Sequence, residues 1–325
     1  MITRQVPGVD KKISPIFFGT ASKPFLQGEI LDQLLDEVFA LGINAIDTAR
    51  DYGNSEKSIG HWLKERQCRD QIFLLSKCAH PDPLTGRDRL NEKDIREDFN
   101  ISSGLLNTDY LDLYLMHRDD PGVPVGEIVE IFNALIREKK ILSYGGSNWS
   151  VKRIREANEY ATEHGLIPMS ASSPNYSLGR QVKNPWIGNC ECIEGPDHKK
   201  DREWYIETQL PVISYSSLGR CMFSGKVKSQ DPKTAEKYLD CFAQKGFAYP
   251  IYFERLRRCE ELAQQKSVSV SQIAMAWCYH TDMNFFAIVG STSALKMKEN
   301  LNALKISLSE EEYTWLSYES HCYFD

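Results

Sequence analysis

The chain has 325 residues, of which 42% are hydrophobic and 26% charged, so it can bury a substantial core. Its formal net charge is −6 and its basic residues form no dense run, which makes nucleic acid and anionic membranes poor partners. No apolar stretch approaches the roughly 18 residues of a membrane span, and the first ten residues lack a signal-peptide core. We therefore expect a cytoplasmic protein.

The cysteines fit the same expectation. There are nine, an odd number with irregular spacing, as is typical of reduced thiols inside a cell. Cys190 and Cys192 form a C-x-C pair, but no second pair of ligands accompanies it. We expect two free thiols on a loop there, and no metal site.

Short apolar segments alternate with amphipathic ones along the chain. The first helix is predicted over Leu26–Leu41, and Gly42 is expected to end it. Further helices are predicted at Ser55–Glu65, Asn91–Leu106, Val125–Lys139, 150–164, 269–279 and from Ser309, with Asn91 and Ser150 as N-caps and capping boxes at Ser269 and Ser309. Eight strands are predicted, at Ile13–Gly19, Asn44–Asp47, Ile72–Lys77, Leu111–Met116, Ile141–Gly146, Met169–Ser173, Val212–Tyr215 and Phe285–Val289.

Eight such units predict a (β/α)8 TIM barrel forming one domain over residues 1–325, because apolar strands between amphipathic helices form a covered parallel sheet. A doubly wound sheet is the alternative, but no G-x-G-x-x-G turn occurs. Two longer segments, Gly188–Glu203 and Leu218–Tyr249, are expected at the barrel mouth. Thr3–Ser14 reads as a hairpin, turning at residues 7–10, that plugs the opposite end.

Three neighbouring strands end in residues that carry chemistry. The second ends at Asp47, the third at Lys77 and the fourth leads to His117, while Tyr52 follows on the loop after Asp47. The C-terminal ends of barrel strands converge on one mouth, so these four side chains should meet. An ammonium beside a tyrosine lowers its pKa, which suits the tyrosine to donate a proton to a carbonyl oxygen.

Each of the four also has an ordinary structural role open to it, such as capping a turn, facing solvent or packing. Together they favour chemistry, because buried strand ends that carry Lys and His need partners for their charge. Metal-assisted hydrolysis is the rival barrel chemistry, but no H-x-H strand end supports it.

Three motifs, in order along the chain, resemble those of the aldo-keto reductase family. They are the run from Gly42 to Glu56 with its Asp-Thr-Ala-x-x-Tyr-Gly core, the strand Leu111–His117, and Gly145-Gly146-Ser147-Asn148. The resemblance covers essentially the whole chain and is greatest to the sugar- and keto-compound reductases. It implies a reductase of a small carbonyl compound, with Tyr52 as general acid/base and Asp47, Lys77 and His117 completing a tetrad.

The resemblance also implies a nicotinamide cofactor. Ser147, Asn148 and Ser173 correspond to residues that hold the carboxamide, and Tyr215 to the aromatic that stacks on the nicotinamide. The remaining cofactor positions implied by the resemblance are Gly19, Thr20, Ser216, Leu218, Gly290, Ser291, Lys296, Glu299 and Asn300.

A cation at Lys296 favours NADP, although NAD stays possible. Two positions depart from the family pattern. Many members have glutamine where Ser173 stands, so the nicotinamide is held less firmly or Asn175 compensates. The family often has arginine at the position of Lys296, and lysine lacks the bidentate fork.

The expected substrate wall consists of Phe25, Arg50, Arg118, Trp149 and Tyr176. The two arginines suit an acidic or polyhydroxylated compound, but each has an aspartate nearby in sequence. Two alternatives to a reductase stay open: a sugar or polyol dehydrogenase working in the oxidative direction, and a nicotinamide-binding regulatory subunit with little turnover. The sequence does not indicate an oligomeric state.

Overall fold

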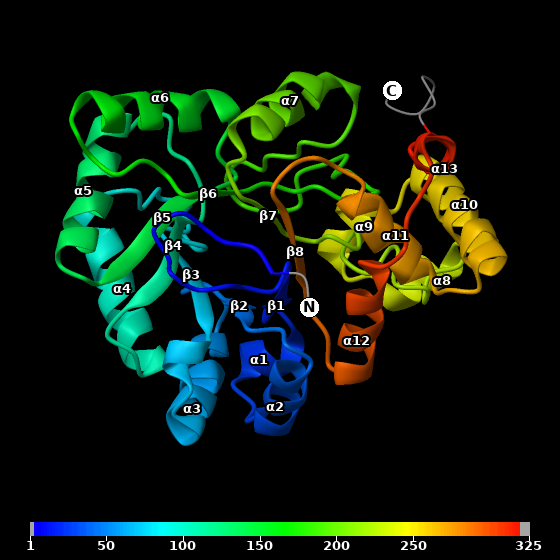
Figure 1. The fold of residues 1–325 in the computed structure, drawn as a ribbon, viewed down its shortest axis with the longest axis horizontal. Coiled ribbons are helices and arrows are strands. Elements are labelled where there is room, and N and C mark those ends of the chain that lie inside the picture. Colours follow the sequence, from blue (N-terminus) through cyan, green and yellow to red (C-terminus); the bar gives the residue numbers. More distant parts are fainter. Residues whose placement is uncertain (1–2, 319–325) are drawn as a thin grey trace.

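A computed structural model describes residues 3–318 of the chain. Its eight strands close into a parallel barrel in sequence order, β1 to β8, and β8 pairs back with β1 (Figure 1). The strands are β1 Ile16–Gly19, β2 Ala45–Asp47, β3 Phe73–Cys78, β4 Leu111–Met116, β5 Ile141–Ser147, β6 Ala171–Ser173, β7 Val212–Ser214 and β8 Phe285–Val289. The predicted (β/α)8 barrel is confirmed, and each strand differs from its prediction by three residues or fewer at either end.

Helices surround this barrel. They are α1 Lys23–Gln27, α2 Asp32–Ala40, α3 Ser55–Arg66, α4 Glu92–Leu106, α5 Val125–Arg137, α6 Val151–Glu163, α7 Lys199–Thr208, α8 Lys233–Tyr238, α9 Cys241–Phe247, α10 Pro250–Lys266, α11 Val270–Tyr279, α12 Ala294–Ala303 and α13 Glu310–Leu316, with short 3-10 turns at Arg69–Gln71 and Pro196–His198. Asn91 and Ser150 cap α4 and α6 as predicted, and both capping boxes form.

The single helix predicted over Leu26–Leu41 was wrong. Gly28 takes a left-handed φ of 78° and ends α1, so the segment divides into α1 and α2. The side-chain periodicity runs through this break, which is why the sequence pattern did not reveal it. The two long segments also contain helical residues that the sequence pattern did not predict, in α7, α8 and α9.

Two apolar layers hold the barrel together. The inner layer fills the barrel with residues such as Phe17, Phe73 and Phe286, whose rings meet edge to face. The outer layer lies between strands and helices and is larger. Close strand packing requires Gly145 in β5, where an added Cβ would lie 2.0 Å from the carbonyl oxygen of Ala171. The packed interior directs the chemistry to the ends of the barrel.

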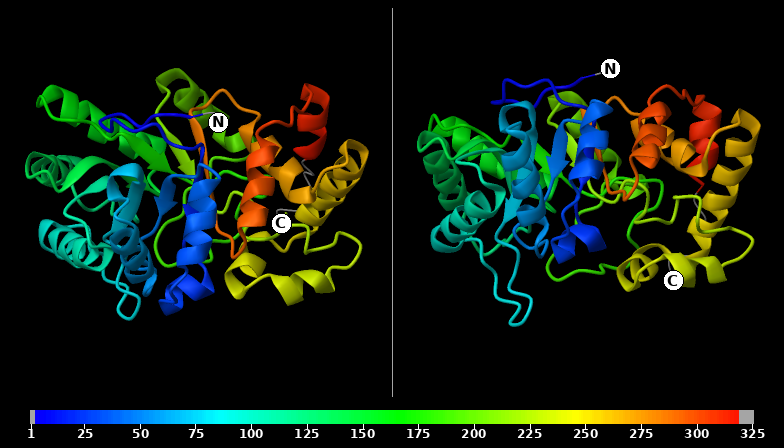
Figure 2. Two further views of the ribbon diagram at one scale, coloured as in Figure 1. Left: turned by 60° about the horizontal axis from the view of Figure 1, so that its bottom comes forward. Right: turned by 90° about the horizontal axis from the view of Figure 1, so that it is seen from below.

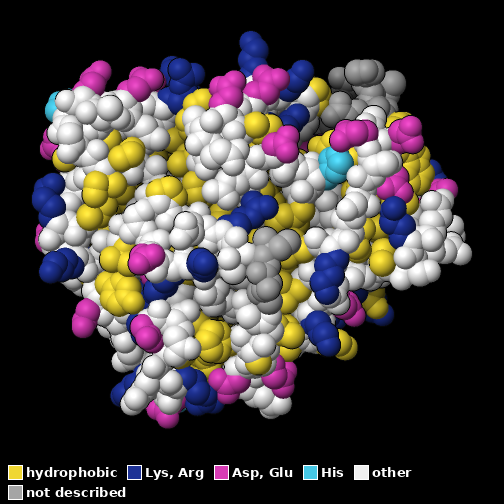
Figure 3. All heavy atoms as spheres, viewed as in Figure 1, with side chains coloured by type: hydrophobic (Ala, Val, Ile, Leu, Met, Phe, Trp, Pro, Cys, Tyr) yellow, Lys and Arg dark blue, Asp and Glu magenta, His cyan; other side chains and the backbone are white. Residues whose placement is uncertain are grey.

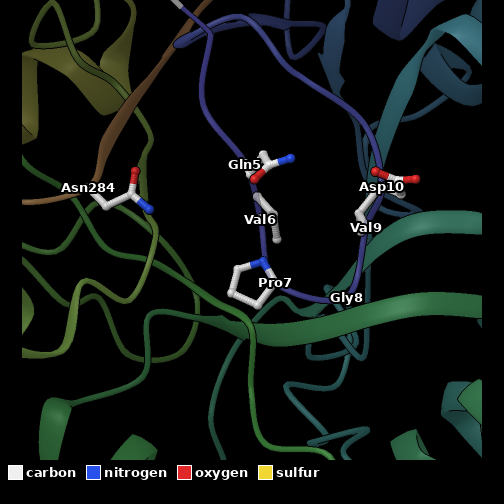
Figure 4. A pocket seen from close by; sticks show the side chains of 7 residues that line it. All are labelled: Gln5, Val6, Pro7, Gly8, Val9, Asp10 and Asn284. Carbon is white, nitrogen blue, oxygen red and sulfur yellow. The ribbon is translucent and has the colours of Figure 1, made fainter.

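The N-terminal hairpin covers one end of the barrel. Arg4 and Ile13 pair in antiparallel fashion, and Val6 and Val9 join the inner apolar layer, so the predicted plug is confirmed. Lys11 fixes the hairpin by a 2.6 Å ion pair with the buried Asp112. A hollow of about 460 Å³ lies beside the turn (Figure 4). Basic and acidic side chains are interspersed on this face of the molecule (Figure 3).

The loops that follow the strands gather at the other end, with α8 and α9 among them (Figure 2). The stretch of chain just before Gly188 contacts the second long segment there: the ring of Trp186 stacks on that of Phe242 at 4.7 Å between centroids. Val182 donates a backbone hydrogen bond to Gly246, and the Arg220 guanidinium lies over both rings. The mouth is therefore bordered by two loops that support one another.

Candidate active site

Tyr52, Lys77, Asp47 and His117 come together at the mouth, at the C-terminal ends of β2, β3 and β4. The Lys77 ammonium donates a hydrogen bond to the Asp47 carboxylate and another, of 3.1 Å, to the carbonyl oxygen of Thr48. Its Nζ also lies 3.4 Å from the Tyr52 hydroxyl. The Tyr52 ring meets the His117 imidazole edge to face at 5.6 Å. Four side chains from separate strands and loops thus form one compact cluster.

Burial and charge set the protonation of this cluster. Burial acts to lower the pKa of Lys77, but the adjacent Asp47 carboxylate and Tyr52 outweigh it and hold the pKa above its ordinary value. The ammonium therefore stays charged. Burial raises the pKa of Tyr52, while the charge of Lys77 opposes this rise. Lys77 thus acts in the expected direction, but the net pKa is not lowered, and Tyr52 keeps its proton at neutral pH.

His117 is neutral. It is 6% exposed, and burial together with the charges of Arg118 and Lys77 places its pKa well below the ordinary value for histidine. Its Nδ1 is buried without a hydrogen-bond partner among the described residues. A second histidine, His80, contacts the same ring at 4.8 Å between centroids. His117 can therefore offer one N–H to an oxygen without carrying a charge.

The three residues expected to hold the carboxamide lie together at the ends of β5 and β6. Ser147 Oγ donates to the carbonyl oxygen of Ser173 at 3.2 Å, and the Asn148 amide donates to Ser147 Oγ at 3.1 Å. The hydroxyl of Ser173 is fully buried, yet it has no hydrogen-bond partner among the described residues. A buried hydroxyl without a partner is unusual, and it fits a site built to bind the polar edge of a ligand.

The segment after β6 covers this cluster. Glu191 donates its backbone N–H to Asn148 Oδ1 at 3.2 Å, and the Asn189 side chain donates to the Asn148 carbonyl oxygen. Asn175, the residue considered as a substitute for glutamine, instead donates to the Tyr215 carbonyl oxygen at 2.9 Å. The cover is anchored from behind by a buried ion pair of 3.0 Å between Glu194 and Arg255 of α10.

The positions expected to bind the rest of the cofactor follow β1, β7 and β8. Gly19 and Gly290 lie side by side, and an added Cβ at Gly290 would be 3.1 Å from the Gly19 carbonyl oxygen. Thr20 is buried, and its hydroxyl donates to the Asp47 carbonyl oxygen at 2.8 Å, so it supports the loop that carries the tetrad. Ser216 and Leu218 are half-buried after β7, and Ser216 has a left-handed φ of 54°.

Lys296 and Asn300 lie on α12 with Glu299, after a turn in which the Ser291 hydroxyl accepts the Ser293 backbone N–H at 3.1 Å. Lys296 is exposed and Asn300 is buried. The Glu299 carbonyl oxygen accepts a hydrogen bond from Gln272. Desolvation raises the pKa of the Cys221 thiol on the loop after β7, while the charges of Lys226, Arg220 and Lys296 act to lower it.

Three residues of the expected substrate wall have buried side chains. Phe25 is fully buried against Phe18, Trp149 is 1% exposed, and Tyr176 is 1% exposed and stacks on Trp277. Their large apolar rings complete the core, so they present no open wall at the mouth. Arg50 is half-buried on the loop after β2, and Arg118 lies directly beyond His117.

The structure also brings in residues that the sequence patterns did not single out. His80 lies beside His117 with Asp51 3.7 Å from its Nδ1, and the charge of Lys226, like that of Lys296, acts on Cys221. His80 stands two residues beyond β3, a position that strand-end reasoning would include if it extended past the last apolar residue. Lys226 belongs to an irregular loop, where no periodicity marks it.

Within residues 3–318, no helix is long and apolar enough to cross a membrane. The part of the chain that the structure describes also contains no group of three or more histidine, cysteine, aspartate or glutamate side chains suited to hold a metal ion. Cys190 and Cys192 instead hydrogen-bond Asn184 and Asn175.

The chain belongs to the aldo/keto reductase family, whose model matches residues 15–317. It is 28% identical to norsolorinic acid reductase A of Aspergillus parasiticus, over 94% of this chain and 77% of that protein. It is 26% identical to a putative voltage-gated potassium channel subunit beta of Schizosaccharomyces pombe, over 83% and 78% of the two chains. The fold matches that of a thermostable aldo-keto reductase, Tm1743, with a TM-score of 0.71 and 23% identity, over 98% of this chain and 99% of that one.

Proposed function

We propose that the protein reduces an aldehyde or ketone to an alcohol with NADPH, and that Tyr52 is the general acid. The observation that carries the proposal is the Tyr52 hydroxyl, 3.4 Å from the ammonium of Lys77 and in ring contact with neutral His117. A protonated phenol, a fixed ammonium and a neutral imidazole together suit proton transfer to a carbonyl oxygen.

Each side chain then has a task. Tyr52 gives its proton to the substrate oxygen, and the Lys77 ammonium stabilises the phenolate that results. Asp47 keeps that ammonium in position, and its carboxylate balances the buried charge. His117 donates a hydrogen bond to the carbonyl oxygen and so orients the substrate. A bound nicotinamide nucleotide supplies the hydride.

The residues present fit such a nucleotide. The unpartnered hydroxyl of buried Ser173, beside Ser147 and Asn148, suits the carboxamide, and Tyr215 offers a ring next to it. Lys296 and Lys226 suit phosphate groups, which favours NADPH over NADH. We infer that the substrate is a small carbonyl compound. The same arrangement serves oxidation of an alcohol, in which Tyr52 accepts the proton.

The test follows NADPH consumption by absorbance with a panel of aldehydes, for the wild type, Tyr52→Phe and the control Tyr238→Phe on α8. General acid catalysis contributes about 10²–10⁴-fold, so turnover should fall by at least about 100-fold in Tyr52→Phe and stay unchanged in the control. NADPH binding, followed by nucleotide fluorescence, should persist in all three proteins.

Other results would redirect the proposal. Full turnover in Tyr52→Phe would exclude this residue as the acid. Tight nucleotide binding by the wild type with no turnover of any aldehyde would favour a regulatory subunit, a role suggested by the similarity to the Schizosaccharomyces pombe protein. Failure to bind either NADPH or NADH would exclude both functions.

A further inference from the structure

Arg118 is a buried cation for which the described residues provide no ion pair. It is 6% exposed, and it follows His117 directly in the chain. Its Nη1 donates to the His117 carbonyl oxygen at 2.8 Å and its Nε to the Ile187 carbonyl oxygen at 3.2 Å. Nη2 has no acceptor within residues 3–318. Buried arginines normally pair with an anion, because carbonyl dipoles do not balance a full charge.

The neighbouring carboxylates are engaged elsewhere. Asp119 pairs with Arg153 of α6 at 3.1 Å, and Asp120 accepts the backbone N–H of Gly122 at 2.9 Å. Asp51 lies 3.7 Å from Nδ1 of His80, and the charge of Arg118 acts to lower its pKa, but the two form no ion pair among the described residues. None of these three aspartates, the nearest in sequence to Arg50 and Arg118, therefore forms an ion pair with the Arg118 guanidinium among the described residues.

The guanidinium also lies beside the catalytic cluster, against His117 and the stretch Ile187–Gly188. On one side its stem is covered by Gly188, where an added Cβ would be 3.3 Å from Cγ of Arg118, and on the other it is bonded to His117. Its charge opposes the rise that burial causes in the pKa of Tyr52 and Tyr215, and it helps to lower the pKa of His117 and His80. Because His117 is in ring contact with Tyr52 and its carbonyl oxygen holds the guanidinium, a ligand that reaches Tyr52 comes close to Arg118.

We infer that Arg118 determines substrate specificity by binding an anionic oxygen group, a carboxylate or a phosphate, carried by the carbonyl substrate. This inference rests on the proposed reductase function and names the class of its substrate. The Nη2 group has N–H donors without an acceptor among the described residues, and a charge-assisted hydrogen bond in a desolvated site discriminates strongly against a neutral analogue. Arg50 adds positive charge on the adjacent loop without forming an ion pair among the described residues.

Matched substrates test this inference. The ratio of kcat/KM is measured with NADPH for 3- and 4-carboxybenzaldehyde against their methyl esters, and for glyceraldehyde 3-phosphate against glyceraldehyde. The wild type should prefer the charged member of at least one pair by about tenfold or more. In Arg118→Met that preference should disappear, chiefly through a higher KM for the charged compound.

Two controls keep the outcome interpretable. Arg137→Met removes the same charge from the exposed last residue of α5, at the far end of the barrel, and should keep the wild-type ratio. A merely structural effect of Arg118→Met would lower kcat/KM equally for the charged and the neutral member of a pair. That result would overturn the inference. So would a wild type that reduces charged and neutral members equally well. If no aldehyde of any kind is reduced, the proposed function itself fails.

Discussion

The hydroxyl of Tyr215 donates a 2.8 Å hydrogen bond to Oδ1 of Asn148, and so links the end of β7 to the end of β5 across the barrel mouth. The same oxygen accepts the backbone N–H of Glu191. Asn148 is thus oriented by the loops around it, with a left-handed φ of 59°. Its amide nitrogen donates to Ser147 Oγ and to the His117 carbonyl oxygen, so the whole amide group is engaged and ties the ends of β4, β5 and β7 to one another.

This link separates two roles of Tyr215, the ring and the hydroxyl. Tyr215→Phe keeps the ring and leaves Asn148 bonded to Glu191, so the Kd for NADPH should change by less than about threefold, equivalent to under about 0.7 kcal/mol. Tyr215→Ala removes the stacking surface and should raise the Kd by about tenfold or more. Fluorescence titration measures both. Equal losses in the two variants would show that the hydroxyl, not the ring, supports binding.

The buried pair of Asp47 and Lys77 should be essential for stability as well as activity. Asp47→Asn keeps the shape but leaves the Lys77 ammonium without its counter-charge, so the free energy of unfolding should fall by about 3–5 kcal/mol. Urea denaturation measures this loss. The double variant Asp47→Asn/Lys77→Met should recover part of it, since no charge is then left buried. A loss below about 1 kcal/mol in Asp47→Asn would contradict the view that the pair is charged and desolvated.

His117 should make the protein sensitive to acid. Its pKa in the folded protein lies well below the unfolded value of about 6.5, so below that pH the unfolded chain binds a proton that the native chain refuses. The stability present above about pH 6.5 is therefore lost as the pH falls, by up to about 1.4 kcal/mol per pH unit from this group. Unfolding of His117→Gln, measured between about pH 5 and 6.5, should show a shallower dependence. An unchanged slope would mean that His117 is protonated in the fold.

Ser173 offers a test of nucleotide binding that does not disturb the fold. Its hydroxyl has no partner among the described residues, so Ser173→Ala should leave the free energy of unfolding within about 0.5 kcal/mol. The Kd for NADPH should rise by about fivefold, the equivalent of one lost hydrogen bond. Calorimetric titration provides the Kd. A variant that binds NADPH as tightly as the wild type would remove Ser173 from the cofactor site.

Lys296 should control the choice between NADPH and NADH. Lys296→Ala should raise the Kd for NADPH by about tenfold and leave the Kd for NADH nearly unchanged, since only NADPH carries the 2′-phosphate. Lys298, also exposed on α12, provides the matched control, because Lys298→Ala removes the same charge two residues away. If Lys296→Ala raises the Kd for both nucleotides equally, the lysine acts on the pyrophosphate or only through the long-range electrostatic potential of the protein.

The sequence predicted the barrel well because its signal is local. Continuous apolar strands such as Leu111–Met116 and capping boxes at Ser269 and Ser309 depend on short stretches of chain. The convergence of Asp47, Lys77 and His117 also followed, since the barrel topology alone brings strand ends together. The break at Gly28 was missed, because a glycine is compatible with either a continued or a divided helix.

The direction of individual side chains was the least predictable feature. Trp149 and Tyr176 follow strand ends, as the catalytic residues do, yet their rings turn into the outer core. Packing between distant elements decides such orientations, as when Tyr176 stacks on Trp277 from α11. The cover that Glu191 and Asn189 place over Asn148 was equally hidden, because it consists of contacts between loops far apart in sequence.

The N-terminal hairpin has a practical consequence for how the molecule is oriented on a solid support. Because Lys11 and Asp112 hold it over the end of the barrel remote from Tyr52, a matrix or electrode that meets the protein on the hairpin side leaves the mouth facing the solution. Maleimide coupling through the exposed thiols of the described residues would do the opposite, since Cys221 follows β7 and Cys241 begins α9, both at the mouth. Attachment chemistry alone would thus decide whether an immobilised sample is open to its ligands or blocked.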